Sequence, residues 1–227
     1  RGSFGPVITN ALFVNNSAAS GGGIFVMGKG KIVNATFYDN SAVDGGAIFN
    51  YSAITEIYNC ILHGNISSSN GNQFYIDGGS VSLGYSSYSN DPGDIYLANG
   101  GVFTPDLNAI TSDPLFINTA GGDLRIYGNS QCVNAGNNSY NTVPTDIRGE
   151  TRIRNATIDM GAYEWTDGVD PLARMITIFV NHAATGLNNG TSWNDAYTSF
   201  QAGLDDALPY DRIWVAKGTY KPSYDYG

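Results

Sequence analysis

The chain of 227 residues is long enough for one large domain or two small ones, and its net charge of −9 disfavours binding to nucleic acid or to an anionic membrane surface. Only 14% of the residues are charged and 29 are glycine, but 15 Tyr, 10 Phe and 3 Trp exclude a disordered polymer. No apolar run approaches the ~18–20 residues of a membrane-spanning helix, so we expect no membrane insertion. This composition indicates many short strands joined by tight turns.

The first 80 residues contain an internal repeat of about 24 residues. Its aligned positions are Asn10, Asn34 and Asn59; Phe13, Phe37 and Leu62; and Asn16, Asn40 and Asn65. A fainter copy follows at residues 81–101, with Tyr88 in the aromatic place. Helical repeats need roughly 33–47 residues, whereas this length suits one solenoid turn of three short strands. We therefore predict an all-β fold, a single-stranded right-handed parallel β-helix with ~24-residue coils stacked at ~4.8 Å.

The aligned residues have distinct expected places in such a coil. Aligned Phe and Ile side chains are expected to stack inside the solenoid. Aligned Asn residues are expected at bends, where they tolerate the left-handed backbone conformation and can form amide ladders. The glycine pairs at 21–22 and 45–46 would supply the backbone freedom for a corner. A β-sandwich would not explain why residue identity recurs in register.

Two short motifs in the repeat resemble a known family. Residues 13–16 (FVNN) and 37–40 (FYDN) are FxxN motifs, and residues 45–48 read GGAI. They are similar to the repeats of polymorphic outer-membrane proteins, which are surface adhesins with β-helical passenger regions. The resemblance implies extracellular display and adhesion, whereas the spacing alone predicts only the solenoid.

Residues 102–165 lose the period but contain further recognisable motifs. These are residues 112–116 (SDPLF), 122–125 (GDLR), 132–136 (CVNAG), 146–149 (DIRG) and 158–164 (IDMGAYE). The set resembles the closing part of bacterial choice-of-anchor β-helix proteins. Asp123, Asp146 and Asp159 suggest calcium binding or catalysis, but Asp at turns that accepts from local backbone amides is the favoured interpretation.

The last third of the chain has a different pattern. Residues 166–174 read as a linker, and residues 175–227 read as a cap of strand, amphipathic helix and first coil. Ser192 is the expected N-cap of that helix, whose apolar stripe is Trp193, Tyr197, Phe200 and Leu204. This segment resembles the beginning of the same β-helix family. The chain is therefore expected to be circularly permuted, with residues 1–165 as the body and the cap placed last.

A solenoid core is open at both ends and needs capping. Six or seven coils would make a rod of about 30 Å, which nine linker residues could barely span. We therefore expect the cap to dock on the first coil of another copy, or of the next repeat in a tandem array. The expected interface residues are Phe4, Ile8, Leu12, Trp193, Phe200, Leu204, Ile213 and Trp214.

Three functions fit this organisation. The first is a secreted or bacterial cell-surface structural and adhesive module that binds itself head to tail. The second is a polysaccharide lyase or hydrolase, which is disfavoured because no paired carboxylates repeat on adjacent coils and His63 and His182 are isolated. The third is a glycan-binding module that uses exposed tyrosines such as Tyr85, Tyr88 and Tyr96. We expect no catalytic residues, metal or cofactor, and Cys60 and Cys132 are either buried thiols or a disulfide.

Overall fold

A computed structural model describes residues 5–166, 176–207 and 211–221. The chain divides into two compact units, Arg1–Thr166 and Asp167–Gly227. About 44% of the chain is strand and 6% is helix, which confirms the prediction of an all-β fold with one short helix. The expected linker, residues 166–174, lies almost wholly outside the described residues.

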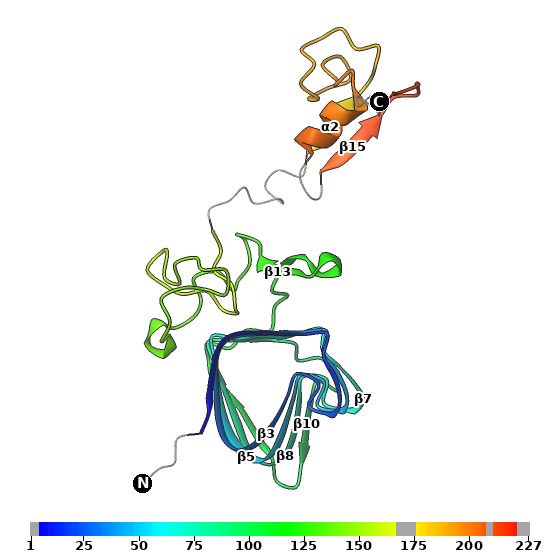
Figure 1. Ribbon diagram of the computed structural model, residues 1–227. Coiled ribbons are helices and arrows are strands. Elements are labelled where there is room, and N and C mark those ends of the chain that lie inside the picture. Colours follow the sequence, from blue (N-terminus) through cyan, green and yellow to red (C-terminus); the bar gives the residue numbers. More distant parts are fainter. Residues whose placement is uncertain (1–4, 167–175, 208–210, 222–227) are drawn as a thin grey trace, which may run out of the picture. The chain divides into compact units, whose positions relative to one another are not determined.

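Parallel strands in the first unit stack into a β-solenoid of about four turns. Figure 1 shows its coils as a three-sided outline, with residues 111–165 over one side. The strands are β1 (Val7–Val14), β2 (Ser17–Ser20), β3 (Ile24–Tyr38), β4 (Ser41–Asp44), β5 (Ile48–Tyr58), β6 (Ile61–His63), β7 (Ile66–Asn70), β8 (Phe74–Gly84), β9 (Ser87–Tyr88), β10 (Ile95–Ala98) and β11 (Val102–Pro105). One sheet contains β1, β3, β5, β6, β8, β9, β10 and β11, and a second has the order β2-β4-β7.

The strand register matches the repeat in the sequence. Phe13 pairs with Phe37, Phe37 with Leu62, and Leu62 with Tyr88. The Phe13 and Phe37 rings are stacked, with centroids 4.4 Å apart. Residue identity therefore recurs because these side chains lie on top of one another inside the solenoid.

The corners have the backbone conformations that the repeat predicts. The φ angles are 57°, 54° and 52° at Asn10, Asn34 and Asn59. At the opposite corner they are 65°, 70° and 69° at Gly21, Gly45 and Gly71. Asparagine and glycine adopt this left-handed conformation at the lowest conformational energy. The two sets therefore let the backbone turn at the same two places in every coil.

The predicted amide ladder joins consecutive coils. The Asn16 Nδ2 donates to Asn40 Oδ1 at 2.9 Å, and the Asn40 Nδ2 donates to Asn65 Oδ1 at 2.8 Å. Asn65 Nδ2 in turn donates to Gln73 Oε1 at 2.7 Å. Because Asn40 and Asn65 are buried, these bonds satisfy polar groups that would otherwise destabilise the solenoid.

The expected number of six or seven coils is wrong, because the chain leaves the stack after Ile110. Residues 111–165 instead pack along one flank of the solenoid, where Ala162 N donates to Thr36 Oγ1 and Gly161 N to Asn59 O. This closing segment contains the antiparallel pair β12 (Phe116–Asn118) and β13 (Asp123–Ile126). It also contains two 3-10 turns, Thr119–Gly121 and Asn138–Tyr140.

A buried cluster of charged groups organises the closing segment. Arg152 is fully buried, its Nε lies 3.5 Å from Glu164 Oε1, and its Nη2 donates to the Gly161 carbonyl oxygen. Asp146 Oδ1 accepts from Arg148 N and Glu150 N. Asp159 Oδ1 accepts from Asn134 N at 2.6 Å. The aspartates therefore order backbone turns, as the sequence indicated.

Glu164 makes the stability of this cluster depend on pH. Burial, together with the nearby Asp159 carboxylate, raises the pKa of Glu164 to about 8. The folded chain therefore keeps a proton that the unfolded chain loses near its ordinary pKa of about 4.3, so this stabilisation is complete below that pH and lost as the pH rises to about 8. We expect the free energy of unfolding to fall across this window in urea titrations. Glu164→Gln should flatten the fall, whereas Glu150→Gln, at an exposed site, should leave it unchanged.

The second unit contains β14 (Thr177–Val180), α2 (Phe200–Asp206) and β15 (Arg212–Val215). The two strands pair in parallel, with Ile178 opposite Ile213. The expected helix start at Ser192 is wrong, because α2 begins at Phe200 after Ser199. The Ser192 hydroxyl donates to Asp195 Oδ2 at 2.8 Å, so it closes a loop rather than capping a helix.

Both cysteines are buried free thiols. Cys60 belongs to the core of the solenoid, and Cys132 belongs to a smaller apolar cluster with Ile61, Ile126 and Met160. This cluster joins the closing segment to the flank. The sequence left open whether these cysteines are thiols or form a disulfide, and in the structure they are thiols.

Candidate assembly interface

The first coil has an open edge. Within the described residues β1 pairs only with β3. By contrast, β5 and the part of β3 at residues 31–38 have neighbours on both sides. Ile8 and Phe13 are half-buried, but their partners in the second coil, Ile32 and Phe37, are 1% and 0% exposed. The first coil therefore presents part of the apolar cross-section that later coils bury.

A hollow of about 100 Å³ lies beside this open edge. Its walls are mostly apolar and include Ile8, Ile24, Val26 and Ile32. In the interior of the solenoid, Ile48, the partner of Ile24, lies between two coils and is fully buried. The hollow is thus the volume that the side chains of a further coil would occupy.

Two polar atoms on β1 are buried without a hydrogen-bond partner. They are Thr9 Oγ1 and Asn10 Oδ1. In the next coils of the same column, Asn34 Oδ1 does have a partner, because it accepts from Asn59 Nδ2 at 3.1 Å. A buried polar atom without a hydrogen-bond partner lowers the free energy of unfolding by about 1–3 kcal/mol. Hydrogen bonding is therefore less complete in the first coil than in the middle of the solenoid.

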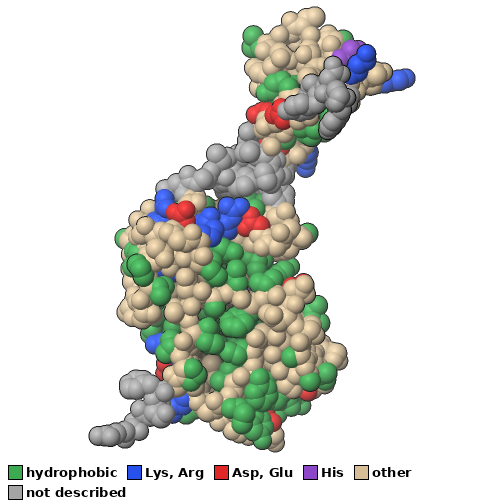
Figure 2. Space-filling view, in the orientation of Figure 1, with side chains coloured by type: hydrophobic (Ala, Val, Ile, Leu, Met, Phe, Trp, Pro, Cys, Tyr) green, Lys and Arg blue, Asp and Glu red, His purple; other side chains and the backbone are tan. Residues whose placement is uncertain are grey.

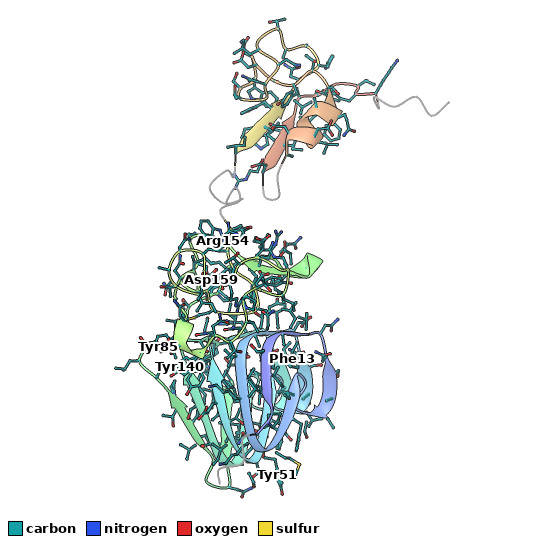
Figure 3. All side chains as sticks on the ribbon, turned by 60° about the vertical axis from the view of Figure 1, so that its left-hand side comes forward. Phe13, Tyr51, Tyr85, Tyr140, Arg154 and Asp159 are labelled. Carbon is teal, nitrogen blue, oxygen red and sulfur yellow. The ribbon has the colours of Figure 1, made fainter. Side chains whose placement is uncertain are left out.

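An aromatic row runs along the outside of the solenoid and ends at the open edge. Successive rings lie 5.0, 4.6 and 5.1 Å apart in the order Phe25, Phe49, Tyr75 and Tyr96. Phe25, the terminal ring, is 45% exposed, and Met27 and Tyr51 beside it are also exposed. Figure 2 shows hydrophobic side chains gathered over β3, β5 and β8, and Figure 3 places Tyr51 on the side away from the closing segment.

Phe25 was missing from the expected interface, although the sequence contained a signal for it. The repeat aligns the Ile-Phe pair at 24–25 with the Ile-Phe pair at 48–49 and the Phe-Tyr pair at 74–75. A row of aligned aromatic residues must end in a ring with one uncovered face. The expected interface contained no residue of this outward row.

The second unit exposes several of the expected residues. Trp193 and Trp214 gather around Phe179, with ring centroids 4.9 and 5.7 Å from it. Trp193 is 44% exposed and Trp214 is 51% exposed. Phe200 and Leu204, on α2, are also partly exposed. These side chains belong to one small unit, where β15 has no partner on its outer edge among the described residues.

The remaining expected residues lie in different surroundings. Ile213 is half-buried on the face of the sheet that packs against Gly203 of α2. Leu12 pairs with Thr36, in the row that the closing segment covers, so it faces the flank and not the core. Phe4 lies outside the described residues.

The open edge differs in charge from the rest of the body. Residues 5–38 contain Lys29 and Lys31 and no acidic residue. From residue 39 to residue 124 the chain contains nine Asp and Glu and no Lys or Arg. The first coil is therefore a positive end on an otherwise acidic solenoid.

The described residues contain one serine–histidine pair, which lies on the flank. His63 Nε2 lies 2.9 Å from Ser87 Oγ, but Ser87 is fully buried. Burial lowers the pKa of His63 to about 4, and no carboxylate bonds to its ring in the described part of the chain. This pair joins two neighbouring coils and gives no access to a substrate.

Comparisons with models of protein families, with curated proteins and with solved structures found no match. In the described part of the chain, no three His, Cys, Asp or Glu side chains come together as metal ligands would. No helix among the described residues is long and apolar enough to cross a bilayer.

Proposed function

We propose that this chain is an extracellular structural module that assembles head to tail, with the second unit of one copy covering the first coil of another. The open edge of β1 and β3 carries this proposal, because it leaves apolar side chains and strand edges uncovered. The exposed apolar side chains of the second unit support it from the other side. A contact between two different surfaces does not close on itself, so repetition produces a filament or a tandem array.

Extracellular or bacterial cell-surface placement is part of the same proposal. Its support is the resemblance of the FxxN, GGAI and closing motifs to surface-displayed β-helix proteins, in circularly permuted order. The parallel solenoid is the architecture that this resemblance implies. Adhesion to surface glycans belongs to the proposal as a secondary role, for which the exposed Tyr51 and Tyr96 are available. Tyr88, which was expected to be exposed, is buried and takes no part in it.

The proposal assigns no catalytic role and no cofactor to the chain. Acid–base cleavage of a polysaccharide needs two carboxyl groups that face one substrate. Here Asp94 accepts from Asn72 Nδ2 and Ser89 Oγ, and Asp146 and Asp159 accept from backbone amides. Each of these carboxylates is thus engaged in holding a turn.

Light scattering of the intact chain over a range of concentrations tests the proposal. We expect the mass to rise above that of one chain with concentration, and denatured material to return to 24.2 kDa. Trp214→Glu should weaken association about tenfold or more, because a desolvated charge costs over 1.4 kcal/mol. Leu107→Glu, at a fully exposed site on the body, should leave association unchanged.

A single-chain mass at every concentration would contradict the proposal. About four turns at ~4.8 Å give a body of roughly 20 Å, which nine extended residues could span. A linker of nine residues is therefore long enough for the second unit to reach the first coil of its own chain, contrary to the expectation from six or seven coils. A mass that is independent of concentration would indicate this closure, or an edge that stays uncovered.

A further inference from the structure

We infer that β15 of one copy pairs in parallel with residues Ile24–Met27 of β3 in a second copy, with Trp214 over Phe25. The inference rests on the proposed head-to-tail assembly and names the strands and the register that form its junction. In this register Ile213 lies over Ile24, Val215 over Val26 and Ala216 over Met27.

Both strand edges are free within the described residues. Residues 24–27 of β3 pair with β5 on one side only, and β15 pairs with β14 on one side only. The edge of β3 is four residues long, because the strand turns at Gly28, where φ is 82°. The edge of β15 (Arg212–Val215) is continued by Ala216, whose N donates to Val180 O of β14 at 2.8 Å. Parallel pairing continues the arrangement that each unit already has.

The competing edge, β1, fits β15 less well. Asn10 has a φ of 57°, so the extended stretch of β1 is interrupted after Val7–Thr9. On that edge an aligned Ile213 and Ile8 would place Trp214 over Thr9. Residues 24–27 provide an uninterrupted stretch and an aromatic partner, and so we favour them.

The two strands alternate in the same way. In β3, Ile24 packs against the core and Phe25 faces outward. In β15, Ile213 faces α2 and Trp214 faces outward, beside Phe179 of β14. Successive side chains of a strand point to opposite faces of the sheet. Only registers that place the inward side chains of β15 over the inward side chains of β3 therefore keep the apolar side chains on both faces covered.

The aromatic row gives the register its specificity. Its last ring, Phe25, has no aromatic neighbour on the side of the open edge within the described residues, and its exposed fraction is 45%. Trp214, in the corresponding outward place of β15, is 51% exposed. Aromatic pairs contribute about 0.5–1.5 kcal/mol beyond the area that they bury. Trp214 over Phe25 would therefore extend the row from one copy into the next.

The apolar side chains beside both edges agree with this pairing. The hollow along residues 24–27 is lined by the inward Ile24 and Val26 and also by the outward Phe25 and Met27. On the inner side of β15 lies α2, whose exposed Leu204 would fill the inner part of the hollow.

Disulfide trapping between two single-cysteine variants tests the pairing. Met27→Cys and Ala216→Cys are mixed under mild oxidation, because both positions are outward and adjacent in the inferred register. Lys29→Cys mixed with Ala216→Cys is the control, shifted by two residues. We expect about tenfold more disulfide-linked dimer from the first mixture, since a disulfide needs Cβ atoms roughly 3.5–4.5 Å apart.

The native cysteines should contribute little background. Burial raises the pKa of Cys60 to about 12 and of Cys132 to about 11, so neither thiol ionises near neutral pH. The unmodified chain, oxidised in the same way, measures the disulfide formation that the native cysteines still contribute. Far-ultraviolet circular dichroism of each variant checks that the fold is kept.

Three results would overturn the inference, and they have different meanings. Assembly with trapping only between Val7→Cys and Arg212→Cys, which face each other when Ile213 lies over Ile8, would place β15 on β1 and leave the head-to-tail function intact. If a chain carrying both Met27→Cys and Ala216→Cys forms the disulfide only within itself, the second unit covers the first coil of its own chain and not that of a second copy. Absence of assembly, with no trapped dimer, would overturn both the junction and the proposed function.

Discussion

Replacing Phe37 by alanine is expected to lower the free energy of unfolding of the solenoid by about 4 kcal/mol. The Phe37 side chain is fully buried, and its ring stacks on Phe13 in the preceding coil. It also packs on Gly23, where even an added Cβ would come within 2.8 Å of the ring. The cavity left by alanine is bounded by backbone of neighbouring coils, which cannot collapse without breaking strand pairs. Equilibrium unfolding in urea, followed by circular dichroism, measures the effect.

Phe13→Ala is the matched control, because it makes the same change in the same row. Phe13 is half-buried at the open edge, so we expect a loss of roughly 1–2 kcal/mol. Both variants should be measured at a concentration where the chain is a monomer. Equal losses would contradict the view that the first coil is uncovered. A larger loss at Phe13 would mean that another element covers that edge.

The solenoid was predictable because residues that pair between neighbouring coils are of the same or a similar type. Asn40 and Asn65 must be asparagine for the ladder to continue, and Phe37 must match Phe13 to stack on it. Each coil repeats the same environment, so the same residue type is favoured at the same place. A period of 24–25 residues therefore specifies which residues pair between neighbouring coils.

The closing segment was not predictable in the same way. It is held by single contacts between distant residues, such as Asn137 N to Asn59 Oδ1 at 2.8 Å and Ala162 N to Thr36 Oγ1 at 3.0 Å. No period links these residues, and the motifs that mark the segment say nothing about where it packs. For that reason the sequence placed further coils on the end of the stack, whereas the chain lies along its flank.

The helix start was mispredicted for a local reason. Trp193, Tyr197, Phe200 and Leu204 have helical spacing, but only the last two lie on α2. Tyr197 instead bridges Val180 of β14. Asp195 Oδ1 accepts from Leu187 N at 2.9 Å, which holds the preceding loop closed. Side-chain bonds from Asp to a loop compete with helix formation, and here they delay the helix to Phe200.

Replacing Arg152 by methionine is expected to destabilise the body by about 3–5 kcal/mol, the cost of removing one partner from a buried charged group. The guanidinium is buried beside Glu164, and its charge opposes the rise that burial causes in the pKa values of Asp159 and Glu164. Methionine keeps the volume of the stem but supplies no charge, so these carboxylates lose their counter-ion. The bond to the Gly161 carbonyl oxygen is lost as well.

Arg154→Met is the control, since Arg154 pairs with Glu150 at 3.2 Å on the surface and should cost less than about 1 kcal/mol. Figure 3 shows Arg154 at the outside of the closing segment and Asp159 within it. The cost of Arg152→Met should also grow with pH. Without the guanidinium the pKa of Glu164 rises further. The additional cost therefore appears above about pH 8, where Glu164 is ionised in the folded unmodified chain but keeps its proton in the folded variant. Urea titrations of both variants at acidic and alkaline pH measure this. A cost that is independent of pH would mean that Arg152 acts by packing alone.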